Sequence, residues 1–129
     1  MKIAIDFDGT CVKHKYPYVG EDIGAVPVLK DLVKQGHQLI LCTMRSHKPV
    51  KGIDCLQDAV DWFKDNDIPL YGINEDPEQN SWTDSRKIYA NVYIDDAALG
   101  CPLISDEYGN IYVNWNRVSE MLKHMQKQN

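Results

Sequence analysis

Residues 1–10 read MKIAIDFDGT, and this stretch decides the fold of the chain. A short apolar run bounded by Asp8-Gly9 is typical of a buried strand that ends in a turn. The carboxylates Asp6 and Asp8 stand where this strand ends. Packing does not explain them, because charged groups are rarely buried unless they are paired or bind a metal. A polar site is therefore expected at the end of the first strand.

A second apolar run ends in the same way. Residues 92–94 lead directly into Asp95-Asp96. Mg²⁺ prefers hard oxygen ligands, usually one or two carboxylates with water and phosphate. The two strand ends together predict a Mg²⁺ site held by Asp6, Asp95 and the backbone carbonyl of Asp8, at which Asp96 acts through water or holds Lys87. The alternative for the adjacent acids is that they cap the N-terminus of a helix.

The composition fits one globular domain spanning residues 1–129. Hydrophobic residues make up 43% of the chain and charged residues 26%, which is ordinary for a protein in water. The net charge of −5 argues against general nucleic-acid binding, which depends on clustered Lys and Arg. There is neither a signal peptide nor a run of about 18 apolar residues, so we expect a cytoplasmic protein without membrane contact.

The four cysteines and four histidines show no metal-binding spacing. No Cys-x-x-Cys pair is present, so neither a zinc site nor a redox motif is indicated. Cys42 and Cys101 border apolar runs, and we expect buried, reduced thiols at both positions.

Strand-like and helix-like segments alternate along the chain. The pattern predicts strands at residues 2–7, 38–43, 68–73 and 91–94, a hairpin of 103–104 with 111–113, and helices at about 27–35, 54–66 and 116–127. This alternation implies an α/β fold with a mainly parallel sheet covered on both faces. In such sheets ligands bind beyond the carboxyl ends of the strands, at the topological switch point. The polar residues of interest all fall at strand ends or shortly before a strand.

Asp6 and Asp8 have the chemistry of a phosphoryl-transfer pair. Residues i and i+2 of a strand point to the same side, so both carboxyl groups can face one pocket. One carboxylate can attack phosphorus, and the other can protonate the leaving oxygen and then activate water. Gly9 permits a tight bend and a close approach of the backbone to an anion. The alternative is a simple Asp8-Gly9 turn capped by Asp6.

Two later segments supply further polar groups. Thr43 ends the second predicted strand, and its hydroxyl and the following N–H groups, from Met44 onward, can donate to a phosphoryl oxygen. Arg45 either clamps an anion or is solvated. Lys87 is placed to neutralise charge at the reacting group, and Arg86 competes for this role.

In chain order, these segments resemble the four motifs of the haloacid dehalogenase superfamily of phosphatases. The corresponding residues are Asp6-Phe7-Asp8-Gly9-Thr10, Thr43, Lys87 and Asp95-Asp96. The match covers residues 6–96, and the remainder suits the closing strands and helix of that fold. The resemblance implies a three-layer Rossmann-like domain, a Mg²⁺ cofactor, and hydrolysis of small phosphomonoesters through an aspartyl phosphate. It implies catalytic roles for Asp6 (nucleophile), Asp8 (general acid/base), Thr43 and Lys87, and substrate contacts at Gly9, Thr10, Met44 and Arg45.

Two features depart from many members of that superfamily. Asp95 follows Lys87 by only eight positions, where relatives often place a helix. The segments 11–26 and 43–87 are too short for a cap domain, which predicts an open site. Either the substrate is large, or a neighbouring subunit of a homo-oligomer or the 11–24 loop shields the site. Side chains of the loop at 13–18 either lean over the pocket mouth or are solvated.

Two other classes of protein compete with a phosphatase. A response-regulator receiver domain also uses an acidic pair, a phospho-accepting Asp, a Thr and a Lys. In receivers, however, the acidic pair comes first and the phosphorylated Asp follows a mid-chain strand, whereas Asp54 follows no buried strand here. The second rival is a non-catalytic binding module on a phosphatase scaffold, against which the intact Asp6 and Asp8 argue.

Overall fold

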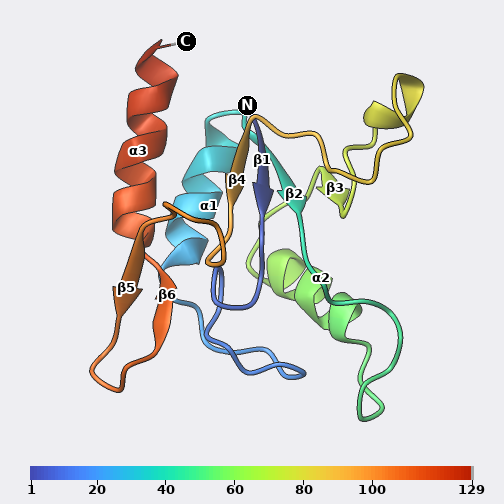
Figure 1. Cartoon of the computed structure of the whole chain (residues 1–129), viewed down its shortest axis with the longest axis vertical. Helices are drawn as coiled ribbons and strands as arrows, with labels where there is room; N and C mark the ends of the chain where they lie inside the picture. The colour runs from blue at the N-terminus through green and yellow to red at the C-terminus, as the bar shows by residue number, and fades with distance from the viewer. Residues whose placement is uncertain (129) are drawn as a thin grey trace.

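The computed structural model of the chain describes residues 1–128, with side chains described through residue 125. Figure 1 shows its elements, which in chain order are β1 (Lys2–Ile5), α1 (Ala25–Lys34), β2 (Gln38–Leu41), α2 (Cys55–Asp65), β3 (Gly72–Ile73), the 3₁₀ turn η1 (Gln79–Ser81), β4 (Val92–Ile94), β5 (Leu103–Ser105), β6 (Ile111–Val113) and α3 (Trp115–Gln128).

A four-stranded parallel sheet forms the centre of the fold. Its order is β3-β2-β1-β4, so β1 lies between β2 and β4. The chain moves outward from β1 to β2 and β3 and then crosses back to β4 on the other side of β1. The strand order therefore reverses between β1 and β4. In open α/β sheets this is where ligands bind.

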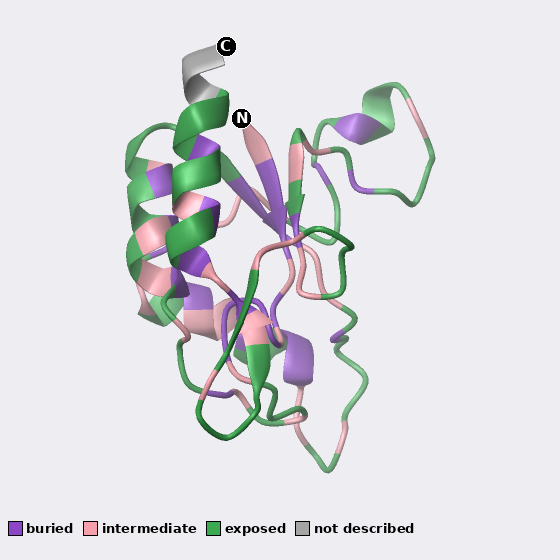
Figure 2. Cartoon of the chain, turned by 60° about the vertical axis from the view of Figure 1, so that its left-hand side comes forward, coloured by how far each residue is buried: buried purple, intermediate pink, exposed green. Residues whose placement is uncertain are grey.

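The three helices contribute to one core, on one face of the sheet. Ile3 and Ile5 of β1 belong to this core, together with Leu29 of α1, Phe63 of α2 and Leu122 of α3. Right-handed crossovers explain why α1 and α2 share a face, because both connections move in the same direction across the sheet. In Figure 2 the buried residues gather in the strands and on the helix surfaces turned toward them.

The opposite face of the sheet is covered by coil. Ala4 and Ile40 point to this side and pack against Ile88, which lies in the return connection from β3 to β4. This connection must cross the face opposite α1 and α2, and its one regular element is η1. Figure 1 shows it on the side of the sheet away from α3. The predicted α/β fold with a parallel sheet is confirmed, and its third layer is an extended segment.

The helix bounds agree with the sequence pattern to within two residues. α1 begins at Ala25, two positions before the predicted start, because Asp22 Oδ1 accepts hydrogen bonds from the N–H groups of Ala25 and Val26. Asp54 caps α2 by accepting from the N–H of Gln57 at 2.9 Å. The hairpin of β5 and β6 is also confirmed and forms a separate antiparallel sheet.

The predicted third strand at 68–73 is too long. Its pairing with β2 begins at Tyr71, whose N–H donates to Leu39, and β3 contains only Gly72 and Ile73. Pro69 explains the shortening, because it has no N–H for the ladder and a fixed φ. β1 and β2 likewise end two residues earlier than predicted, so Asp6 and Thr43 lie just beyond the paired strands.

The cysteine expectation needs a correction. Cys42 and Cys101 are only partly buried, whereas Cys11 and Cys55 are fully buried in the core. All four thiols are free. Cys42 follows the end of β2 and Cys101 lies in the loop before β5, so neither is enclosed by packed elements. Residues 11–24 form a loop with isolated β-bridges. Within residues 1–128, no helix is long and apolar enough to cross a membrane.

Candidate active site

Three acidic side chains meet at the switch point between β1 and β4. The N–H of Asp6 donates to the carbonyl of Ile94 at 2.9 Å, which extends the strand ladder by one residue and brings Asp6 beside Asp95. Asp6, Asp95 and Asp96 each offer a carboxylate oxygen, and these atoms lie within 4.8 Å of one another. The structure thus brings together the three carboxylates that the sequence predicted at the metal site.

The crowding of these acids changes the chemistry of Asp6. Burial raises the pKa of Asp6, and the negative charge of Asp95 raises it further, to about 7. A hydrogen bond from Thr10 works in the opposite direction. The neighbouring carboxylates therefore repel one another. A cation bound between them would reduce this repulsion.

Thr10 holds the two strand ends together. Its hydroxyl donates to Asp6 Oδ2 at 2.9 Å and accepts from the N–H of Asp96 at 3.0 Å. The side chain is fully buried. Thr10 was expected to contact substrate, but the structure places its hydroxyl between two protein partners. It orients the nucleophile candidate and the acidic pair.

Gly9 allows the loop after β1 to fold back over the acids. Its φ is +79°, in the left-handed region that glycine favours, and a Cβ there would clash with the His14 ring and the Asp96 carboxylate. The sequence predicted that Gly9 lets an anion approach the backbone closely. In this structure the His14 ring and the Asp96 carboxylate lie against the Gly9 backbone instead.

His14 belongs to the 13–18 loop, whose side chains were expected either to lean over the pocket mouth or to be solvated, but its contact with Asp96 was not predicted. Its Nε2 lies 2.9 Å from Asp96 Oδ2, so Asp96 pairs with His14 and not with Lys87. The chain returns to the strand end because the N–H of Gly9 donates to the carbonyl of Val12 at 2.7 Å. In the sequence, Asp8-Gly9 indicates a turn after the first strand, but it does not predict how far the chain folds back toward Asp96.

Asp8 lies apart from the acidic cluster, in an ion pair with Arg45. The Nε and Nη2 groups of Arg45 donate to the two carboxylate oxygens of Asp8, each at 2.8 Å. Arg45 is only 3% exposed, so the expectation of a solvated arginine is wrong. Burial alone would lower the pKa of Arg45, but the hydrogen bonds and charge of Asp8 raise it. The cation remains charged in a buried position.

A cavity of about 290 Å³ opens between the acids and the end of β2. It is lined by Asp6, Asp8, Tyr16, Thr43, Met44 and Arg45. The Thr43 hydroxyl accepts from the N–H of Arg45 at 3.1 Å, which keeps its own O–H as a donor. Asn74 Oδ1, a partner that sequence reasoning missed, accepts from the Thr43 N–H at 2.8 Å. Met44 is 98% exposed and stands at the rim.

Lys87 lies on the coil-covered side of the sheet. Its ammonium is 5.7 Å from the centre of the Tyr93 ring, two positions before Asp95. Its side chain is exposed and lines a separate hollow with Trp82 and Tyr89, not the cavity at Asp6. Arg86 is also exposed. A role for either cation at the reacting group stays a prediction.

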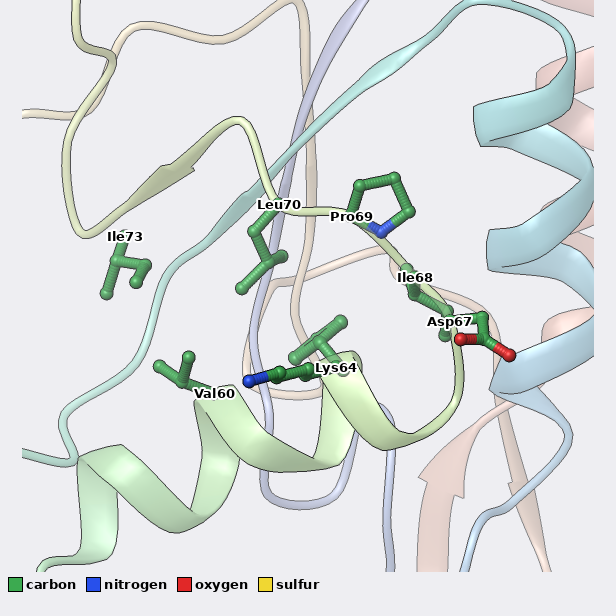
Figure 3. A pocket seen from close by; sticks show the side chains of 8 residues that line it. Val60, Lys64, Asp67, Ile68, Pro69, Leu70 and Ile73 are labelled. Atoms are coloured by element: carbon green, nitrogen blue, oxygen red, sulfur yellow. The ribbon is translucent and has the colours of Figure 1, made fainter.

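A larger hollow lies away from these groups. It measures about 600 Å³ and is formed between α2 and residues 67–73. Figure 3 shows Val60 and Lys64 on α2 facing Leu70 and Ile73. Its lining is mostly apolar, and Lys64 and Asp67 are its charged members. The candidate catalytic residues Asp6, Asp8 and Thr43 line the smaller cavity together with Arg45.

Comparison with known proteins gives one informative relative. No protein-family model matches the chain, and no curated protein sequence does. A solved structure, that of a conserved protein from Bacteroides thetaiotaomicron, is similar over 97% of this chain and 91% of its own. The two chains are 36% identical in sequence and superpose with a TM-score of 0.76.

Proposed function

The chain belongs to the same family as the conserved protein from Bacteroides thetaiotaomicron, and we propose that it is a Mg²⁺-dependent phosphohydrolase that cleaves phosphomonoesters. One observation carries the proposal. The carboxylates of Asp6, Asp95 and Asp96 converge at the switch point of a parallel sheet, and Asp8 follows two residues after the first of them. The resemblance to haloacid dehalogenase phosphatases supports the same reaction.

The donor set at the switch point fits Mg²⁺. Three half-buried carboxylates supply the hard oxygen atoms that this ion prefers. Asp6, Asp95 and Asp96 would hold it, with the backbone carbonyl of Asp8 as a further candidate. When bound, Mg²⁺ supplies positive charge to the phosphoryl oxygens and orients the substrate. Opposite charge beside Asp6 also favours the ionised carboxylate that a nucleophile requires.

The side chains around the cavity can divide the reaction between them. A carboxylate oxygen of Asp6 attacks phosphorus, the ester P–O bond breaks, and an aspartyl phosphate forms while the leaving oxygen takes a proton. Asp8 in its protonated form is the group proposed to deliver this proton; it becomes a carboxylate, which in the second step removes a proton from the attacking water. We propose that the Thr43 hydroxyl and the N–H of Met44, both from residues that line the cavity, donate to the phosphoryl oxygens.

The shape of the cavity bears on the substrate. It is open, without a cap domain, and its rim carries Met44 and the half-exposed ring of Tyr16. A small phosphomonoester can therefore place its phosphoryl group at the acids and its leaving group between these two side chains. Of the two expectations for the 13–18 loop, the structure favours the one in which it leans over the pocket mouth, since Tyr16 lines the cavity.

The proposal is tested with the purified protein and a panel of phosphate esters, with Mg²⁺ and with chelator. We expect multiple turnovers that require the metal and are lost in Asp6→Asn. Asp65→Asn, which removes an exposed carboxylate on α2, is the matched control and should leave turnover unchanged. A single phosphorylation without turnover would indicate a receiver, and inertness toward the whole panel would indicate a binding module.

A further inference from the structure

Arg45 is unusual because its whole hydrogen-bonding capacity is used inside the protein. A guanidinium has five N–H donors. Two of them bind Asp8, and the others donate to the backbone carbonyls of Pro17, Tyr18 and Cys55 at 3.3, 2.7 and 3.1 Å. In this arrangement Arg45 has no donor left for a phosphoryl oxygen. This argues against the substrate-binding role that the sequence suggested.

The acceptors of Arg45 come from three separate parts of the chain. Asp8 follows β1, Pro17 and Tyr18 belong to the loop before α1, and Cys55 begins α2. The guanidinium carbon also lies 5.0 Å from the ring centre of Phe7 and 5.3 Å from that of Tyr16. Arg45 thus fixes the Tyr16–Tyr18 segment relative to the end of β1. Both of these segments contribute side chains to the cavity.

A purely stabilising role explains this arrangement poorly. Buried ion pairs contribute little net stability, because the cost of removing both charges from water offsets their attraction. Their better supported effect is to fix one arrangement of the groups that they join. Here the joined groups are the acid/base candidate Asp8 and the loop that carries Tyr16.

We propose that Arg45 is a positioning residue that fixes the Asp8 carboxylate and the Tyr16–Tyr18 segment to one another, and that it acts on catalysis through them without contacting the phosphoryl group. This inference rests on the proposed function of the cavity. In this proposal the Tyr16–Tyr18 segment and the Asp8 carboxylate form one structural unit, because both are hydrogen-bonded to Arg45.

The first test is a double-mutant cycle of Arg45→Lys and Asp8→Asn, assayed with para-nitrophenyl phosphate and Mg²⁺. Lysine keeps the charge but cannot form the two-pronged contact. We expect Arg45→Lys to lower kcat by about 100-fold, as misplacement of a catalytic group does, with KM changed by less than about threefold. Asp8→Asn should then cost about 100-fold less in the Arg45→Lys background than in the wild type, because the two residues act as a unit.

Two outcomes of the cycle would overturn the proposal. A rise in KM with kcat unchanged would show that Arg45 binds the phosphoryl group directly. Additive losses would show that Arg45 and Asp8 act independently. Arg117→Lys is the matched control, because Arg117 is exposed on α3 and pairs only with Glu120 among the described ion pairs. It should leave kcat, KM and the effect of Asp8→Asn unchanged.

The second test does not depend on activity and so separates this inference from the proposed function. Hydrogen exchange is followed at the Tyr18 amide, which donates to Lys15, and at the amides of β1. In Arg45→Lys we expect exchange at Tyr18 to accelerate by at least about tenfold while β1 stays protected. Unchanged exchange at Tyr18, or equal acceleration in β1, would overturn the positioning role even if the protein cleaves no ester.

Discussion

Asp6 and Asp8 are two residues apart, yet their surroundings differ in charge. Asp6 lies with Asp95 and Asp96, where burial and like charge raise its pKa to about 7. Asp8 lies against Arg45, a buried cation that satisfies both of its oxygens. The Asp6 side of the site therefore has an excess of negative charge, whereas on the Asp8 side Arg45 supplies the neutralising positive charge.

On the proposed function, this difference separates two tasks of a phosphoryl-transfer site. The Asp6 side has carboxylates in excess, which suits a divalent cation and the phosphoryl group that would share it. The Asp8 side is already neutralised and held in place, which suits a group that must present a carboxyl oxygen in a fixed direction. Five predictions break or sharpen this contrast, from the largest expected effect to the smallest.

Asp6→Asn should have the largest effect, because it removes the proposed nucleophile. We expect kcat to fall by about 10⁴-fold or more, as for other nucleophile deletions, in steady-state assays with Mg²⁺. Acid quenching should trap a phosphorylated protein with the wild type but none with the variant. Substantial residual turnover by Asp6→Asn would assign the nucleophile to another residue.

Asp8→Asn should lower kcat by about 10²- to 10⁴-fold, the usual contribution of a general acid or base. The contrast predicts that Mg²⁺ binding, followed by calorimetry, changes little in this variant, whereas Asp95→Asn weakens it strongly. An equal loss of Mg²⁺ affinity in both variants would remove the distinction between the two sides.

The stability of the metal-free protein should depend on the pKa of Asp6. The unfolded chain releases this proton near pH 4, whereas the native state keeps it up to about pH 7. The contribution to stability is therefore complete below about pH 4 and is lost as the pH rises through 7. Thermal unfolding in chelator should show this decline in the wild type and a flatter curve in Asp6→Asn.

Mg²⁺ should reverse that loss at pH 7. A free concentration 100 times Kd stabilises the native state by about 2.7 kcal/mol. The rise in Tm should be absent in Asp6→Asn and present in Asp65→Asn. An equal rise in all three proteins would place the ion elsewhere.

The cation expected near the phosphoryl group gives the smallest effect. Lys87 and Arg86 are both exposed in the loop before β4, and the ammonium of Lys87 lies over the ring of Tyr93. We expect Lys87→Met to reduce kcat/KM by about tenfold, or about 1.4 kcal/mol, and Arg86→Met to change it less. The reverse order in kinetic assays would give the role to Arg86.

The sequence predicted those parts of the molecule that depend on local pattern. Apolar runs ending in acids located β1, β4 and the meeting of Asp6 with Asp95, because parallel strands place their carboxyl ends at one edge. The helix α2 followed from its apolar period, and the structure adds Asp54 as its N-cap. Pro69, which lies within the strand predicted at 68–73, shortened β3 to two residues.

The parts that escaped prediction depend on contacts between distant segments. Arg45 and Asp8 are 37 positions apart, and nothing local in the sequence distinguishes a buried, paired arginine from a solvated one. His14 reaches Asp96 because a loop folds back across the strand end, over 82 positions of sequence. Tertiary packing of loops determines such contacts, and short patterns do not encode it.

The central claim is that the ends of β1 and β4 hold one divalent cation between them. Anomalous diffraction from a crystal soaked in Mn²⁺, which shares the oxygen preference of Mg²⁺, tests it most directly. A single strong peak within coordination distance of Asp6 and Asp95, and lost in Asp6→Asn crystals, is the predicted result. A peak elsewhere, or carboxylates of Asp6 and Asp95 turned away from a common centre, would contradict it.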